Sequence, residues 1–141
     1  MEWNPAYSTG IEEIDAQHKK LLSLFSMVVR ASEDPEAWGD VRLLAKDLRQ
    51  FAEFHFKFEE ALMRVFRFPG WEAHALVHQS FLTQCDARLN KSLIEGGDAQ
   101  DEVLEFLSAW VTNHILKADM EYSKLIRDKL QRCQQSDEVF A

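Results

Sequence analysis

Four long segments with helical periodicity, separated by short breaks, make up most of the chain. Within each segment apolar residues recur every three to four positions, which is typical of an amphipathic helix with one buried face. The segments cover about residues 11–31, 36–66, 71–94 and 98–133. No strand-like alternation competes with this pattern. Four such helices joined by short loops predict an all-α fold, an antiparallel up-down-up-down four-helix bundle.

The breaks and chain ends complete the predicted organisation. Residues 1–10 are expected to form an extended N-terminal arm, because Pro5 and Gly10 oppose helix formation. Asp34 can cap the second helix, and Asp98 can cap the fourth after the terminating pair Gly96-Gly97. Residues 134–141 are expected to form a frayed tail. The whole of 1–141 is then a single domain.

The chain's charge and composition exclude several classes of function. A net charge of -8 disfavours nucleic acid as a partner, because phosphate binding needs clustered basic residues. No apolar stretch approaches the roughly 20 residues that span a bilayer. The first residues also lack the basic region followed by an apolar run that is typical of a secretion signal. Cys85 and Cys133 lack Cys-x-x-Cys spacing. We therefore expect a cytoplasmic protein without membrane insertion, disulfide or thiolate metal site.

All five histidines fall on the inward stripe of a predicted helix. On the second segment, for example, the stripe runs from Leu44 through His55 to Val65. A single inward histidine is more often a core residue with satisfied hydrogen bonds than a metal ligand. Five imidazoles in one bundle interior would leave many polar atoms without partners unless a cation bound them. The inward set is His18, His55, His74, His78 and His114.

Two pairs have the spacing that directs both side chains to one site. His55 precedes Glu59 by four residues, and His74 precedes His78 by four. Such i, i+4 pairs lie about 40° apart on a helix, so both members can reach one centre. Glu60 points about 100° further round and is interpreted as a solvated charge.

His114 and Asp119 are separated by five residues, which puts them about 140° apart on a regular helix. Either they flank a site wide enough for two metals, or a π-type widening brings them together. Imidazole and carboxylate ligands without thiolate suit iron, manganese or zinc. Seven candidate ligands are too many for one ion, so the sequence predicts a dinuclear centre.

The complete set of His18, His55-x3-Glu59, His74-x3-His78 and His114-x4-Asp119 resembles the ligand signature of the haemerythrin family. The opening Tyr7-Ser8-x-Gly10 and Ile14-Asp15-x-Gln17-His18 are similar to its bacterial branch, the bacteriohaemerythrins. The resemblance extends to about Tyr122. It implies a four-helix bundle that holds two non-haem iron ions, and myohaemerythrin is itself a standard example of that fold.

The resemblance also implies how the ligands divide. One iron takes His74, His78 and His114 and the other takes His18 and His55. Glu59, Asp119 and an oxo or hydroxo group bridge both ions. One coordination position then stays open on the iron with two histidines, and dioxygen binds there. By the same similarity, the residues that line the oxygen pocket are Phe56, Trp110 and Leu116.

Reversible oxygen binding for carriage, storage or local delivery is the leading hypothesis, with no catalytic residues and no enzyme activity. Oxygen or nitric oxide sensing through a partner protein is one alternative. A di-iron enzyme of peroxidase type is another, although no histidine here has the Glu-x-x-His spacing of carboxylate-rich di-iron sites. A structural zinc or manganese site is a third. We expect a monomer, because no long apolar patch is left exposed on these helices. The sequence does not identify the oxygen-consuming protein that would receive the oxygen.

Overall fold

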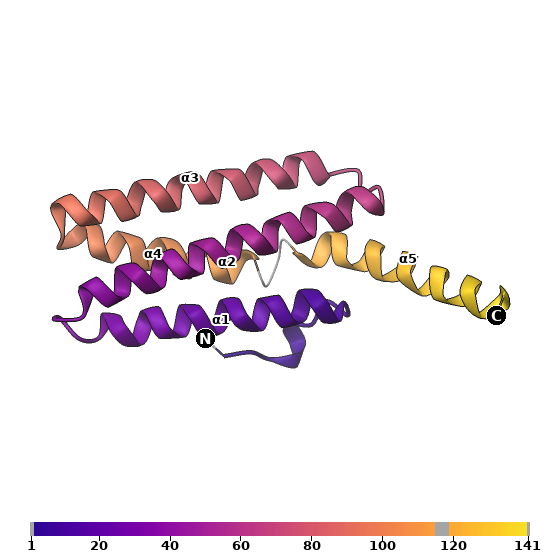
Figure 1. The fold of residues 1–141 in the computed structure, drawn as a ribbon, viewed down its shortest axis with the longest axis horizontal. Helices are drawn as coiled ribbons and strands as arrows, with labels where there is room; N and C mark the ends of the chain where they lie inside the picture. Colours follow the sequence, from indigo (N-terminus) through magenta and orange to yellow (C-terminus); the bar gives the residue numbers. More distant parts are fainter. Residues whose placement is uncertain (1, 115–118, 141) are drawn as a thin grey trace.

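The computed structural model describes residues 2–114 and 119–140, with side chains for 2–114 and 122–132. These residues form helices and no strands (Figure 1). The elements are a short 3-10 helix η1 (Pro5–Tyr7) and the α-helices α1 (Glu12–Ser32), α2 (Trp38–Val65), α3 (Trp71–Glu95), α4 (Asp98–Asn113) and α5 (Asp119–Phe140). The prediction of an all-helical chain is confirmed for the described residues.

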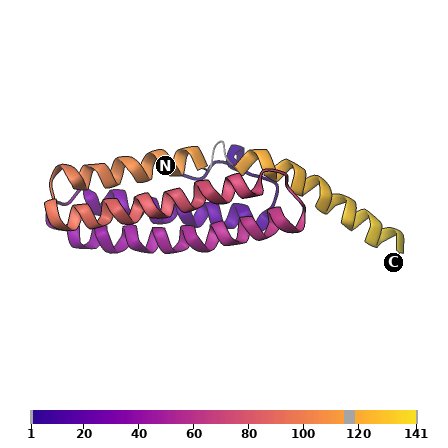
Figure 2. The ribbon, with the colours of Figure 1, turned by 90° about the horizontal axis from the view of Figure 1, so that it is seen from above.

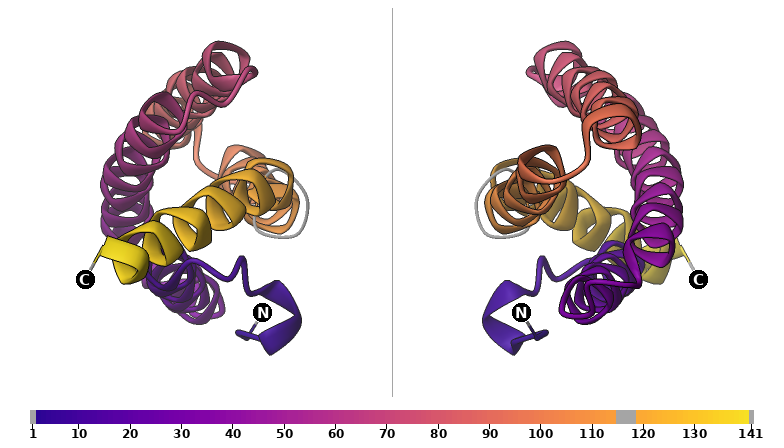
Figure 3. Two further views of the ribbon diagram at one scale, coloured as in Figure 1. Left: turned by 90° about the vertical axis from the view of Figure 1, so that its right-hand side faces the viewer. Right: turned by 90° about the vertical axis from the view of Figure 1, so that its left-hand side faces the viewer.

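Helices α1 to α4 pack around a common interior. α1 contacts α2 and α4, and α3 contacts the same two helices. Figure 2 shows α1 to α4 lying side by side, while α5 continues beyond the end at which α1 and α3 begin. In the end-on views of Figure 3, α5 crosses this end, and it contacts α2 there. None of the helices in the described ranges combines the length and apolarity that crossing a membrane requires.

The helix starts differ from the sequence prediction in three places. Pro5 does not oppose helix but begins the 3-10 turn η1, where its fixed φ fits and its missing N–H is not needed. Asp34 accepts a hydrogen bond from the Glu36 backbone N–H at 3.0 Å, so it caps a turn, and α2 begins only at Trp38. Asp98 is the first residue of α4, after Gly97.

The break between α3 and α4 lies where the glycine pair predicts it. α3 ends at Glu95, and Gly96 and Gly97 follow with φ of 61° and 49°. Side chains rarely tolerate positive φ, whereas glycine adopts it at little steric cost. The two glycines therefore stop one helix and allow the next to turn back against it.

The fourth predicted segment, 98–133, is not described as one helix. α4 ends at Asn113 and α5 begins at Asp119, with residues 115–118 outside the described ranges. The α5 backbone continues to Phe140, beyond the residue 133 at which we expected the helix to end.

Two apolar clusters of unequal size fill the interior. The larger lies between α1, α2, α3 and α4, and its buried members include Leu21, Leu48, Phe56, Phe81 and Leu107. The smaller lies at the end that α5 crosses, and its buried members are Ile11, Ile14, Met63, Tyr122 and Ile126. On α1, His18 lies between Ile14 of the smaller cluster and Leu21 of the larger. The two clusters therefore flank a polar layer.

The buried face of α2 differs from the predicted stripe. Val65 is 72% exposed, whereas Met63 is fully buried. Ala45 and Ala52 also lie on the buried face, with no exposed surface. Small residues let neighbouring helices approach closely, so they belong to the buried face. A prediction based on the large apolar residues alone places the centre of that face at the wrong angle around the helix. The prediction that Val65 faces inward was wrong for that reason.

The buried thiol of Cys85 gives a prediction about reactivity. Burial, with a contribution from the neighbouring Asp86, raises the pKa of the Cys85 thiol to about 11. Since the thiolate is the reactive form, we expect Cys85 to react with Ellman's reagent at pH 8 at least about 100-fold more slowly in the folded than in the unfolded protein. The Cys133→Ser variant isolates this thiol, and equal rates before and after denaturation would contradict the prediction.

Candidate metal centre

The polar layer between the two apolar clusters gathers six of the seven predicted metal ligands. They come from four helices: His18 from α1, His55 and Glu59 from α2, His74 and His78 from α3, and His114 from the end of α4. All are buried except His74, whose side chain is 15% exposed. The i, i+4 spacing on α2 and α3 therefore brings each pair of side chains to the same region, as the sequence predicts.

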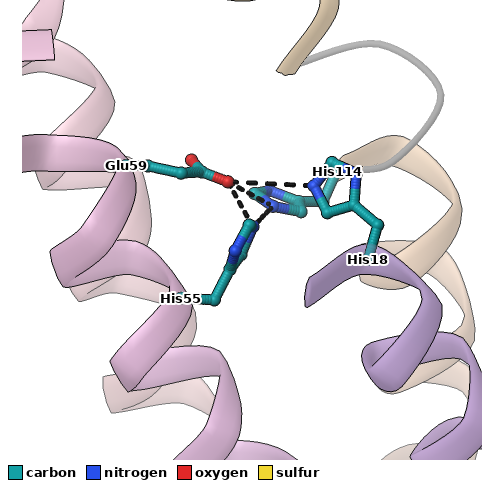
Figure 4. A group of neighbouring side chains, drawn as sticks. All are labelled: His18, His55, Glu59 and His114. Atoms are coloured by element: carbon teal, nitrogen blue, oxygen red, sulfur yellow. Dashed lines mark hydrogen bonds and ion pairs between the residues drawn. The ribbon is translucent and has the colours of Figure 1, made fainter. Parts of the chain in front are cut away.

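Glu59 is the centre of the arrangement, and three imidazoles face its Oε1 atom (Figure 4). Nε2 of His114 lies 3.2 Å from Oε1, Nε2 of His18 lies 3.9 Å away, and Nε2 of His55 is in direct contact. The Nε2 atoms of His55 and His114 are 3.0 Å apart. Figure 4 shows His55 and Glu59 projecting from α2 toward His18 and His114 on the facing helices, so their ligand atoms share one small volume.

The other carboxylate oxygen of Glu59 faces α3. Nε2 of His78 lies 3.3 Å from Oε2, and Nε2 of His74 lies 3.5 Å from it. The ligand atoms thus form two groups that share Glu59: one with His18, His55 and His114, and one with His74 and His78. Within each group the ligand atoms lie within 4.8 Å of one another. A single carboxylate thus lies between two sets of imidazoles.

The electrostatics of Glu59 favour a cation at this point. Burial by itself would raise the pKa of Glu59, but the nearby His55 and His114 outweigh it, and the pKa lies well below its ordinary value. Both carboxylate oxygens and Nε2 of His78 are buried without a hydrogen-bond partner among the described residues. Buried polar atoms need such partners or a metal ion, so this donor set fits metal ions.

Two predicted site residues fall outside what the structure describes. Asp119 is the first residue of α5, but its side chain is among those not described, and Leu116 lies outside the described residues altogether. Their roles stay predictions. The backbone at His114 is π-helical, the local feature that the five-residue spacing to Asp119 suggested as one alternative.

The position of His114 differs from the division of ligands that the resemblance implies. The resemblance places His114 with His74 and His78, whereas its Nε2 lies on the Oε1 side of Glu59 with His18 and His55. Its ring centroid is 5.1 Å from that of His55 and 5.9 Å from that of His78. The imidazole of His114 therefore lies close to both groups.

Aromatic rings cover the side of the site that faces the larger apolar cluster. Phe56 stacks on the His78 ring with centroids 3.9 Å apart, and Trp110 stacks on the His114 ring at 4.7 Å. The two aromatic rings also meet edge to face at 5.4 Å. These two predicted pocket residues thus contact the imidazoles directly.

Two polar side chains that sequence reasoning did not assign to the site contact its histidines. Gln17 Oε1 lies 2.6 Å from Nδ1 of His55, and Glu60 Oε2 lies 3.2 Å from Nδ1 of His78. Interpreting Glu60 as a solvated charge was wrong, since its side chain is only 23% exposed. The 100° rotation from Glu59 points Glu60 toward α3, and the histidine pair on that helix was the signal that could have found it.

Comparisons with known proteins identify the family of the chain. The Hemerythrin HHE cation binding domain matches residues 9–126. Proteins named Bacteriohemerythrin from Pseudomonas paraeruginosa and Clostridium acetobutylicum are 29% and 27% identical, over 90% and 85% of this chain and 87% and 96% of their own. A Hemerythrin-like protein of Naegleria gruberi is 30% identical over 88% of this chain and 92% of its own. The chain therefore belongs to the haemerythrin family, whose domain holds a di-iron centre and binds oxygen.

Proposed function

We propose that this protein binds dioxygen reversibly at a non-haem di-iron centre, for carriage, storage or local delivery. The observation that carries the proposal is the position of Glu59, a buried carboxylate with imidazoles facing each of its two oxygens. One carboxylate shared by two sets of nitrogen ligands is what a bridged pair of ions requires. Membership of the haemerythrin family supports the same reading.

The proposed ligands follow the two sides of Glu59. His18 and His55 hold one ion, and His74 and His78 hold the other. His114, close to both pairs, completes the five imidazoles. Asp119 is proposed as the second bridging carboxylate, on the strength of the family signature.

The iron pair, when bound, supplies the electrons with which dioxygen is held. The chain's own contribution is to fix the ligands and to keep water out. Phe56 and Trp110, stacked on His78 and His114, form an apolar wall beside the site. We propose Leu116 as a further part of this wall. Excluding water from a reactive centre protects it from side reactions, and reversible binding depends on such protection.

Binding is favoured over catalysis by the type of ligand. The residues three positions before the histidines are Asp15, Ala52, Trp71, Ala75 and Val111, so the Glu-x-x-His pairs of carboxylate-rich di-iron sites are missing. A histidine-rich set donates less negative charge to the metal and gives less support to the oxidised iron that oxygenases need. We therefore propose a binding protein and not an oxygenase.

The finer features of the fold belong to this proposal. We propose that α1 to α4 form an antiparallel four-helix bundle with an N-terminal arm, as one domain. Its support is that α1 and α3 each pack against both α2 and α4, and that short connections join consecutive helices. The monomeric state and the cytoplasmic location stay predictions.

An optical titration tests the proposed function. The reduced, iron-loaded protein is exposed to air and then deoxygenated, with visible absorption recorded throughout. We expect a charge-transfer band that rises on aeration and disappears on deoxygenation over repeated cycles. The zinc-loaded protein is the matched control and should give no band. Absence of a band, or continuous consumption of added reductant, would rule out reversible binding.

A further inference from the structure

His78 has different partners at its two ring nitrogens. Nε2 points into the metal centre, 3.3 Å from Oε2 of Glu59. Nδ1 points away from the centre, 3.2 Å from Oε2 of Glu60. Glu60 lines a pocket of about 120 Å³ between α2 and α3, so its carboxylate lies between His78 and the protein surface. Nε2 is thus available to bind metal, and Nδ1 is hydrogen-bonded to Glu60 on the outer side of the ring.

The Glu60 carboxylate favours the tautomer of His78 that leaves Nε2 free to bind metal. A carboxylate accepts hydrogen bonds and does not donate them, so Glu60 favours hydrogen on Nδ1, while Glu59, 3.3 Å from Nε2, competes for that hydrogen when no metal is bound. With hydrogen on Nδ1, the lone pair of Nε2 faces the Glu59 carboxylate, a second acceptor. Two acceptors facing each other in a buried site are stabilised when a cation binds both.

Phe56 constrains the same ring in a different way. Its ring stacks on His78 with centroids 3.9 Å apart and planes within 6° of parallel. Stacking fixes the plane of the imidazole, but a ring turned over by 180° would stack equally well. The bond to Glu60 distinguishes these two orientations, because only one of them places Nδ1 toward Glu60.

His55 has the corresponding arrangement with a neutral partner. Its Nδ1 lies 2.6 Å from Oε1 of Gln17 on α1, and its Nε2 faces Glu59. An amide oxygen and a carboxylate both accept the Nδ1 hydrogen, but the carboxylate also carries negative charge. A charged acceptor makes the imidazole a stronger electron donor through its other nitrogen. The α3 side of the centre therefore receives the more strongly donating ligand.

We propose that Glu60 is a positioning residue that fixes His78 with its Nε2 toward the metal and strengthens it as a ligand, while Gln17 does the same for His55 without the charge. This inference rests on the metal centre proposed above. It assigns unequal ligand strength to the two sides of Glu59, with the metal held more firmly on the side of His74 and His78.

Nitrogen NMR of the metal-free protein tests the positioning without any metal. Long-range proton–nitrogen correlation spectra distinguish a protonated from an unprotonated ring nitrogen. We expect Nδ1 of His78 to carry hydrogen in the wild type and in Glu60→Gln, which keeps an acceptor. In Glu60→Leu we expect the hydrogen to move to Nε2, toward Glu59, the acceptor that remains. A single unchanged tautomer in Glu60→Leu would overturn the positioning role.

A cobalt(II) titration, followed by visible absorption, tests the effect on ligand strength. Outer hydrogen-bond partners of ligating histidines typically contribute 10- to 100-fold in metal affinity. We expect Glu60→Leu to weaken one of the two binding steps by that factor, and Glu60→Gln to weaken it less. Glu53→Gln is the matched control, because Glu53 lines the same pocket and bonds to Arg49 but to no histidine. It should bind cobalt as the wild type does.

The outcomes separate this inference from the proposed function. If the wild type binds two cobalt ions and Glu60→Leu binds them with the same affinity, the role of Glu60 is refuted and the proposed metal centre stands. Equal weakening by Glu53→Gln and Glu60→Gln would also refute it, because a general charge effect would then explain both. A wild type that binds no cobalt, with the His78 tautomer as expected, would instead refute the proposed metal centre.

Discussion

Replacement of Glu59 by glutamine is expected to abolish tight binding of both metal ions while leaving the helices folded. The two carboxylate oxygens face different sets of imidazoles, with His114 3.2 Å from Oε1 and His78 3.3 Å from Oε2. Glutamine offers one oxygen and one NH₂ group, so an N–H donor would face one set of ligands, and the negative charge would be lost. We expect a loss in affinity beyond the roughly 100-fold typical of outer-shell changes.

Metal content after anaerobic loading with iron(II) and desalting measures this effect, with circular dichroism reporting on the fold. Glu53→Gln is again the suitable control, because it removes a carboxylate six residues earlier on α2, outside the ligand set. Retention of two irons per chain in Glu59→Gln would show that Glu59 does not bridge the ions.

Removal of metal should lower the melting temperature by roughly 10–15 °C. A ligand present at about 1,000 times its dissociation constant stabilises the folded state by about 4 kcal/mol, and in a domain of this size each kcal/mol corresponds to a few degrees. The metal-free state is less stable because a fully buried carboxylate, Glu59, then lies among imidazoles with no cation to bind it and them.

Differential scanning calorimetry of the iron(II)-loaded protein, with and without a chelator, measures the shift. The Glu59→Gln variant provides the control, since a chelator should not change its melting temperature. An equal melting temperature for loaded and chelated wild type would mean that metal binding is not coupled to folding.

The sequence predicts that the candidate ligands on α2 and on α3 lie together, because their geometry is local. The i, i+4 spacing of His55 and Glu59, and of His74 and His78, fixes their common direction as soon as the helices form. Placing His18 and His114 in the same interior also requires the apolar faces of four helices to meet. The periodicity of the whole chain predicts that packing. The break after α3 was equally local, because Gly96 and Gly97 take positive φ with little steric cost.

What the sequence did not predict depends on neighbouring helices. Glu60 bonds to a histidine on α3, so its role follows from how α2 and α3 pack and not from its own helix. Val65 was placed inward because large apolar residues marked the stripe, whereas close helix packing selects the face that contains Ala45 and Ala52. The tertiary contact, and not the local pattern, determines such positions.

The polar layer of the metal centre divides the interior into two apolar clusters, and this division has a consequence for unfolding. The smaller cluster depends on few residues, among them Ile14, Met63 and Tyr122, and gathers them from segments distant in the chain. Without metal, the polar layer between the clusters adds no apolar packing, so we expect amide hydrogens at this end to exchange by partial opening, ahead of global unfolding. Bound metal, held by ligands from four helices, would join the two halves into one cooperative unit.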